Sequence, residues 1–213
     1  MQSRVMITSE LLNQLGFPAI LEACQCRTPQ GSRFKASVHF FGPENKFELE
    51  REVAAVNRLN AMVKDKQPQL IEALTQLARL RELRGTFSRL DKNDLLDDTE
   101  FFELKSSLNI FYRLSKLTDL LRAADIFLED TSVAAALLNP DGKYNPSFHI
   151  YSSYSSALAE IRARKKELER QISQSAGAER ATLLQQRSFV IAEEDQEEDR
   201  IRRDLGAKLA EWL

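Results

Sequence analysis

Glycine and proline are scarce in this chain, and their scarcity limits the folds that it can adopt. Only seven glycines and six prolines interrupt 213 residues. A fold made of many short strands would need a turn roughly every 8–12 residues, and such turns are usually built with these two residues. Between the few breaks, apolar residues recur at steps of three and four, which is the period of a helix face. The sequence therefore predicts an all-α fold, a multi-helix bundle with long helices.

The clearest helix is expected from about residue 99 to residue 128. Asp97 can cap its first turn, and Glu100 is correctly spaced to complete a capping box. At 1.5 Å per residue this helix would be ~40 Å long. Its apolar residues keep helical spacing and are expected to form the core: Phe101, Leu104, Leu108, Phe111, Leu117, Leu121, Ala124 and Leu128.

Other helices are expected on both sides of this one. An apolar stripe that only Asn60 interrupts predicts a packed helix over residues 47–64. A further helix should follow Pro68 and end at Gly85. After the turn Asn139–Gly142, a serine-rich segment can cap a long helix that reaches Ile172. The last helix should start near Glu179.

The last helix carries an acidic run, residues 193–199, that contains no apolar side chain. A helix that is polar on all sides for two turns is expected to lie at the surface or project into water. Arg200, Arg202 and Arg203 follow directly and can balance the charge. The alternative is that carboxylates three and four residues apart bind a hard cation.

The common catalytic motifs are missing from this sequence. It has no phosphate-binding loop of the form G-x-x-x-x-G-K-[ST], no G-x-G-x-x-G and no G-x-S-x-G. His39 is expected on a packed helix, and His149 lies in a loop without an identifiable partner. Cys24 and Cys26 are too close in sequence for a usual structural disulfide and are expected to pack in a helix. We expect neither catalysis nor a bound cofactor or metal.

The charge balance argues against a protein that grips DNA by a basic excess, since the net charge is −2. One expected helix is nevertheless locally basic. Its side chains are candidate contacts to a DNA backbone: Arg162, Arg164, Lys165, Lys166 and Arg170. The alternative is a solvated helix face on which these residues pair with Glu160, Glu167 and Glu169.

The compartment is expected to be the cytoplasm, with no membrane partner. Residues 1–8 lack the charged and then apolar pattern of a signal peptide. No apolar run approaches the ~18 residues that a membrane-spanning helix needs. Two neighbouring free thiols are compatible with a reducing environment.

Two groups of segments resemble the core and lever of the MutS family of DNA mismatch-repair ATPases. The first group contains LGFPAIL at residues 15–21, RTPQG at residues 27–31 and the expected helix over residues 48–59. The second contains DDTEFFELK at residues 97–105, NPDGK at residues 139–143 and SSYSSALAEIR at residues 152–162. These segments consist of helix caps, turns and packing positions, and together they cover roughly residues 9–172.

The resemblance implies a non-catalytic fragment in which helices couple an ATP-driven change to DNA clamping. Residues 1–130 would form a helical core domain, and residues 131–213 would form lever helices leading toward a clamp or back to an ATPase domain. ATP and Mg²⁺ would bind that ATPase domain, expected beyond Leu213. DNA would be a partner of the full-length protein, which would be a homodimer. The alternative is a stand-alone helical adaptor for protein–protein interaction.

Overall fold

The computed structural model describes residues 9–38, 40–142 and 147–212, and all regular secondary structure in these ranges is helical. The predicted all-α fold is thus confirmed. None of the described helices is both long and apolar enough to cross a membrane. His39, expected on a packed helix, lies outside the described residues.

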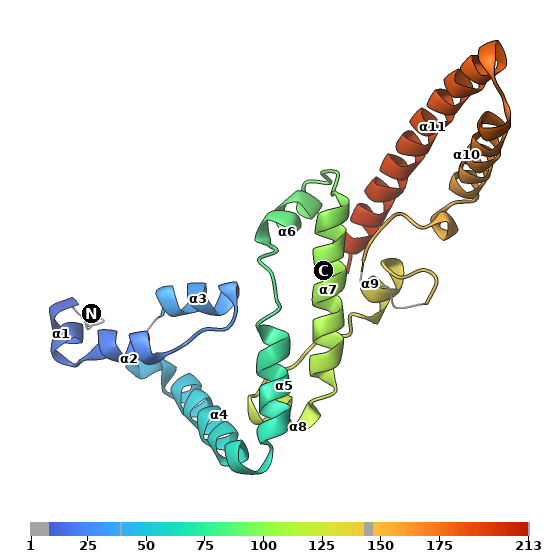
Figure 1. The fold of residues 1–213 in the computed structure, drawn as a ribbon. Coiled ribbons are helices and arrows are strands. Elements are labelled where there is room, and N and C mark those ends of the chain that lie inside the picture. The colour runs from blue at the N-terminus through green and yellow to red at the C-terminus, as the bar shows by residue number, and fades with distance from the viewer. Residues whose placement is uncertain (1–8, 39, 143–146, 213) are drawn as a thin grey trace. The chain divides into compact units, whose positions relative to one another are not determined.

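The chain divides into two compact units, each of which is built from two segments (Figure 1). Unit 1 contains residues 1–82 and 110–129, and unit 2 contains residues 83–109 and 130–213. One crossing between the units, at residues 129 and 130, is close to the predicted domain boundary. Residues 83–109, which were expected in the first domain, group instead with the later part of the chain.

Unit 1 has a small helical core. Its helices are α1 (Ser9–Gln14), α2 (Phe17–Ala23), α3 (Pro29–Ala36), the 3-10 turn η1 (Pro43–Asn45), α4 (Lys46–Asp65), α5 (Gln67–Leu77), the last part of α7 (Asp98–Ser115) and α8 (Thr118–Ala123). Thr28 caps α3 as its sequence suggests, because its hydroxyl accepts a hydrogen bond from the backbone N–H of Gly31 at 2.8 Å. The core centres on Ala73, Ile110, Leu114 and Leu120.

Helix α4 differs from its prediction in which face it buries. Ala55 is buried, and Leu59 and Met62 pack against the unit 1 core. The expected packed stripe is exposed instead, and Val56, near its middle, is 62% exposed. The members of this exposed stripe are Leu49, Val53, Val56 and Val63. The sequence predicted the helix correctly, but the prediction of a buried stripe was wrong.

Cys24 and Cys26 are also not packed as expected. Helix α2 ends at Ala23, and Cys24 has extended backbone angles of φ −74° and ψ 101°. Both cysteines are free and exposed. The cysteines therefore follow the helix rather than belonging to its packed face.

Unit 2 contains the larger core. Its helices are α6 (Arg84–Asp91), the first part of α7 (Asp98–Ser115), α9 (Ser132–Leu137), the 3-10 turn η2 (Ser152–Tyr154), α10 (Ser156–Gln174) and α11 (Gly177–Ala210). Phe101, Leu104 and Leu108 are buried as predicted. The Phe101 ring stacks on Phe148 with a centroid distance of 5.0 Å. This core joins helices that are distant in the sequence.

The expected single helix over residues 99–128 is two helices. In the last turn of α7 the backbone N–H groups of Lys116 and Leu117 bond to carbonyls three residues earlier, which tightens the turn. Leu117 then leaves the helical region with ψ 53° before α8 begins. Similarly, the helix expected to reach Gly85 ends at Leu77, and Gly85 lies within α6.

The predicted capping box at the start of α7 is present. The backbone N–H of Glu100 donates to Oδ1 of Asp97, and the backbone N–H of Asp97 donates to Oε2 of Glu100, both at 2.9 Å. Glu100 also accepts a hydrogen bond from Arg89 at 2.6 Å. Two otherwise unpaired helix-end N–H groups are therefore satisfied.

Replacing Asp97 with alanine should lower the free energy of unfolding by about 1 kcal/mol, because α7 loses its capping carboxylate. Urea unfolding followed by helicity measures the change. Asp94→Ala is the matched control, since it removes an exposed aspartate outside the helix and should have an effect below about 0.5 kcal/mol. Equal effects of the two substitutions would show that the cap does not stabilise α7.

Candidate functional site

Helices α10 and α11 form a long antiparallel hairpin, which is the most extended feature of unit 2 (Figure 1). Helix α10 has 19 residues and α11 has 34, so α11 is ~50 Å long at 1.5 Å per residue. Ser175 and Ala176 join the two helices, and Gly177 follows with a φ of 60°, where a side chain would be strained. The break between the helix expected to reach Ile172 and the helix expected to start near Glu179 is therefore confirmed.

The base of the hairpin is anchored in the core of unit 2. Leu158 of α10 is fully buried, and so is Leu209 of α11. Ile201 and Leu205 are buried in the same cluster, which also contains Phe101. Ser155 caps α10 by accepting from the backbone N–H of Leu158 at 3.4 Å. Because Leu158 and Leu209 are buried in the same apolar core, the base of α10 and the base of α11 are held together.

Above the base, the two helices are joined by a row of ion pairs that we call the charged seam. It consists of Arg162, Arg164 and Lys165 on α10, and Glu193, Glu194 and Glu198 on α11. Arg162 donates to Glu194 at 2.9 Å and to Glu198 at 2.8 Å. Nearer the turn, Arg187 of α11 pairs with Glu169 of α10 at 3.1 Å.

The charged seam corrects the prediction for the acidic run. Residues 193–199 were expected to lie at the surface or project into water, with Arg200, Arg202 and Arg203 balancing their charge. Arg200 and Arg202 do pair with Glu197 and Glu198, but Glu194 and Glu198 also contact the basic face of α10. Glu194 is buried, and Arg162 and Lys165 bond to its two carboxylate oxygens. Opposite charges on facing helices can thus replace the apolar residues that the run lacks.

The electrostatics of the seam favour ionised carboxylates. Burial of Glu194 by itself raises its pKa, but hydrogen bonds and charge from Lys165 and Arg162 outweigh burial and hold this pKa below the ordinary value. Hydrogen bonds from Arg200 and then from Ser155 lower the pKa of Glu197 to about 2. These carboxylates therefore stay charged well into the acidic range.

The structure places the five candidate DNA-contact residues in different environments. Arg162 and Lys165 lie within the charged seam, and exposed Arg164 pairs with Glu193. Arg170 bonds to Glu167 of its own helix at 2.6 Å, as the alternative of a paired helix face predicted. Lys166 is exposed and makes no ion pair with the described residues. The outward-facing cations of the set are Arg164, Lys166 and Arg170.

The remaining sequence candidates are not assembled into a chemical site. Within the described ranges, no three histidine, cysteine or acidic side chains are grouped as a metal site would require. The carboxylates of the acidic run pair with arginine and lysine instead. His149 is exposed, and its ring lies 4.1 Å from that of Tyr151.

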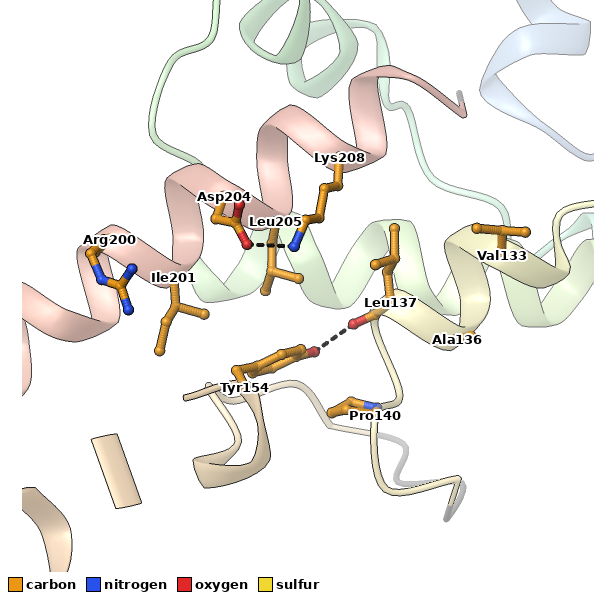
Figure 2. Close-up of a pocket in the computed structure, with 10 residues that line it drawn as sticks. All are labelled: Val133, Ala136, Leu137, Pro140, Tyr154, Arg200, Ile201, Asp204, Leu205 and Lys208. Atoms are coloured by element: carbon orange, nitrogen blue, oxygen red, sulfur yellow. Dashed lines mark hydrogen bonds and ion pairs between the residues drawn. The ribbon is translucent and has the colours of Figure 1, made fainter. Parts of the chain in front are cut away.

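A hollow at the base of the hairpin was not anticipated from the sequence. It has a volume of about 400 Å³ and lies between α9, η2 and the lower part of α11 (Figure 2). The Tyr154 hydroxyl donates to the carbonyl of Leu137 at 2.7 Å, and Lys208 pairs with Asp204 at the rim. Burial, and then Tyr151 and Asp141, raise the pKa of Tyr154 well above its usual range.

The side chains that line this hollow pack against and pair with one another. Tyr154 remains a neutral hydroxyl at physiological pH, and it ties η2 to the end of α9 (Figure 2). Ile201 and Leu205 provide apolar walls, while the charge of Lys208 is already neutralised by Asp204. The functional argument consequently centres on the hairpin.

Comparison of the chain with protein-family models, curated proteins and solved structures gave no match. The geometry of the hairpin and the motifs of the sequence are therefore the observations on which a functional proposal rests.

Proposed function

We propose that this chain is the non-catalytic core and lever region of a MutS-like DNA mismatch-repair ATPase, in which it couples an ATP-driven change to DNA clamping. The observation that carries the proposal is the α10–α11 hairpin, whose base is buried in a core that also holds α7. The segment SSYSSALAEIR, on which the resemblance partly rests, forms η2 and the start of α10.

The hairpin has the mechanical properties that a lever needs. Closely packed apolar residues at its base resist deformation, so a displacement of the core moves both helices together. The charged seam and the Arg187–Glu169 pair then hold α10 and α11 in register along their length. A rigid element of this kind is one physical means of coupling two distant sites.

The coding sequence beyond Leu213 tests the family assignment. We expect a phosphate-binding loop of the form G-x-x-x-x-G-K-[ST] within a few hundred codons, because the ATP and Mg²⁺ of the proposed protein would bind there. A stop codon directly after Leu213 would contradict the proposal. The purified chain itself should not hydrolyse ATP, and measurable hydrolysis would likewise oppose the assignment.

Binding to DNA tests the part that the hairpin would play. We expect weak binding to duplex DNA that falls steeply with salt, measured by fluorescence anisotropy. Changing both Lys166 and Arg170 to glutamate should reduce the slope of the logarithm of the binding constant against the logarithm of the salt concentration by about 2. Each phosphate contact contributes about one unit to this slope. The matched control reverses Arg79 and Lys92, which are exposed cations outside the hairpin. Equal losses in both variants would contradict a hairpin contact.

A stand-alone helical adaptor is the second candidate function. The exposed stripe of α4, formed by Leu49, Val53, Val56 and Val63, favours this alternative because it presents apolar surface along one helix. An adaptor would bind another protein through this stripe and would leave duplex DNA unbound. The DNA-binding measurement therefore separates the two proposals.

A further inference from the structure

Helix α4 is apolar on two different faces. Its inner face, with Ala55, Leu59 and Met62, packs in unit 1. Arg51 and Arg58 extend this inner face by bonding to Asp125 and to the carbonyl of Ala123. The outer face carries the exposed stripe defined above. A helix that has already buried one apolar face normally presents polar residues on the other.

The exposed stripe has the spacing of a coiled coil. Steps of four and three lead from Leu49 to Val53, Val56, Asn60 and Val63. Apolar residues with this seven-residue repeat form the line of contact along which two helices pack in a coiled coil. A single asparagine within such a seam is typical of helix pairs in which a polar residue fixes the register at some cost in stability.

The charges that flank the stripe are ordered along the helix. On one side lie Glu50, Asn57 and Lys64, and on the other lie Glu52 and Leu59. The first side is acidic near the start of α4 and basic near its end. Side chains at these flanking positions are the ones that meet across a helix pair and select partner and direction.

This charge order matches a second copy of α4 that runs in the opposite direction. With Val53 facing Val63 of the second copy and Val56 facing its Asn60, Glu50 lies beside Lys64 of that copy. A parallel pair would instead place Glu50 beside Asn45 and Lys64 beside Leu59, so it would form no opposite-charge pair.

We infer that the exposed stripe of α4 is a self-association surface, on which two copies of this chain pair through antiparallel α4 helices. The inference does not depend on the proposed lever function, since α4 belongs to unit 1 and the hairpin to unit 2. Charge complementarity, as well as apolar exposure, identifies a second copy of the chain as the partner that binds the stripe.

Sedimentation velocity of the full chain over a range of concentrations tests this inference. We expect a monomer–dimer equilibrium, and Val56→Asp should raise the dimer dissociation constant by at least about tenfold, because it places a charge in the centre of the seam. Val56 is exposed in the single chain, so the helicity of this variant should match that of the unsubstituted chain.

Charge reversal tests the direction of the pairing. Glu50→Lys and Lys64→Glu should each weaken the dimer, and the double variant should restore it, because every pair then again joins opposite charges. Glu72→Lys and Lys92→Glu, at exposed positions outside α4, are the matched controls and should leave the dimer unchanged. A chain that remains monomeric, a dimer indifferent to Val56→Asp, or a double variant without restoration would each overturn the inference.

Discussion

Replacing Phe101 with alanine is expected to lower the free energy of unfolding of unit 2 by about 3–5 kcal/mol, the usual cost of deleting a buried aromatic side chain. Phe101 is 0% exposed and stacks on Phe148, and it lies in the same cluster as the base of the hairpin. The resulting cavity would loosen the anchorage of both α10 and α11. Urea unfolding, with hydrogen exchange of the α10 and α11 amides, measures the loss.

Phe102 provides a matched control for this prediction. It is the next residue of the same helix and is 40% exposed, so Phe102→Ala should cost less than about 1.5 kcal/mol. The hydrogen exchange of the hairpin amides should be close to normal in the control. If the two variants lost equal stability, the anchorage of the hairpin would not depend on the buried core around Phe101.

Replacing Glu194 with alanine should produce the second largest effect, a loss of about 1–3 kcal/mol. Its carboxylate is buried and accepts bonds from both Arg162 and Lys165, which would be left without this partner in a partly buried position. Glu193→Ala is the control, because Glu193 pairs at the surface with exposed Arg164 and should contribute less than about 0.5 kcal/mol.

The lowered pKa of Glu194 also predicts how the stability of the Glu194→Ala protein and of the unsubstituted chain depends on pH. The folded-state pKa of Glu194 lies below its ordinary value of 4.5, so its contribution is complete above about pH 4.5. The contribution is lost as the pH falls through the lowered pKa. Between pH 7 and pH 3, the Glu194→Ala protein should therefore lose less stability than the unsubstituted chain. An identical pH dependence of the two proteins would show that the seam does not stabilise the hairpin through this charge.

Local signals in the sequence predicted the starts of α7 and α10 well. The capping box of Asp97 and Glu100 and the serine-rich start of α10 both involve residues within three positions of each other. The buried residues near the start of α7 were also predicted, because a helix fixes which side chains share a face. Such features require no knowledge of distant parts of the chain.

The sequence could not determine which of two apolar faces a helix buries. In α4 both Leu59 on the inner face and Val56 on the outer face keep helical spacing, and only the position of the neighbouring helices decides between them. The break after Ser115 was missed for a related reason. Apolar spacing continues across Leu117, so the pattern does not show where the backbone leaves the helical region.

The charged seam illustrates what was missed at the candidate site. Glu194 lies 32 residues after Arg162 and 29 residues after Lys165, far beyond the reach of helical periodicity. A signal was nevertheless present, because a basic run precedes the turn at Ser175 and Ala176 and an acidic run follows it. An antiparallel hairpin brings such runs together, so two runs of opposite charge around a turn predict their pairing.

The central claim is that the α10–α11 hairpin moves as one rigid body with the core of unit 2. Double electron–electron resonance tests this most directly, because it measures the distribution of distances between two spin labels. The labels are attached at Lys92→Cys and Ala181→Cys, with Cys24 and Cys26 changed to serine. The labels would lie just after α6 and near the turn of the hairpin, both within unit 2. We predict a single narrow distance distribution that broadens in the Glu194→Ala protein. A broad distribution in the chain with intact Glu194 would contradict a rigid lever.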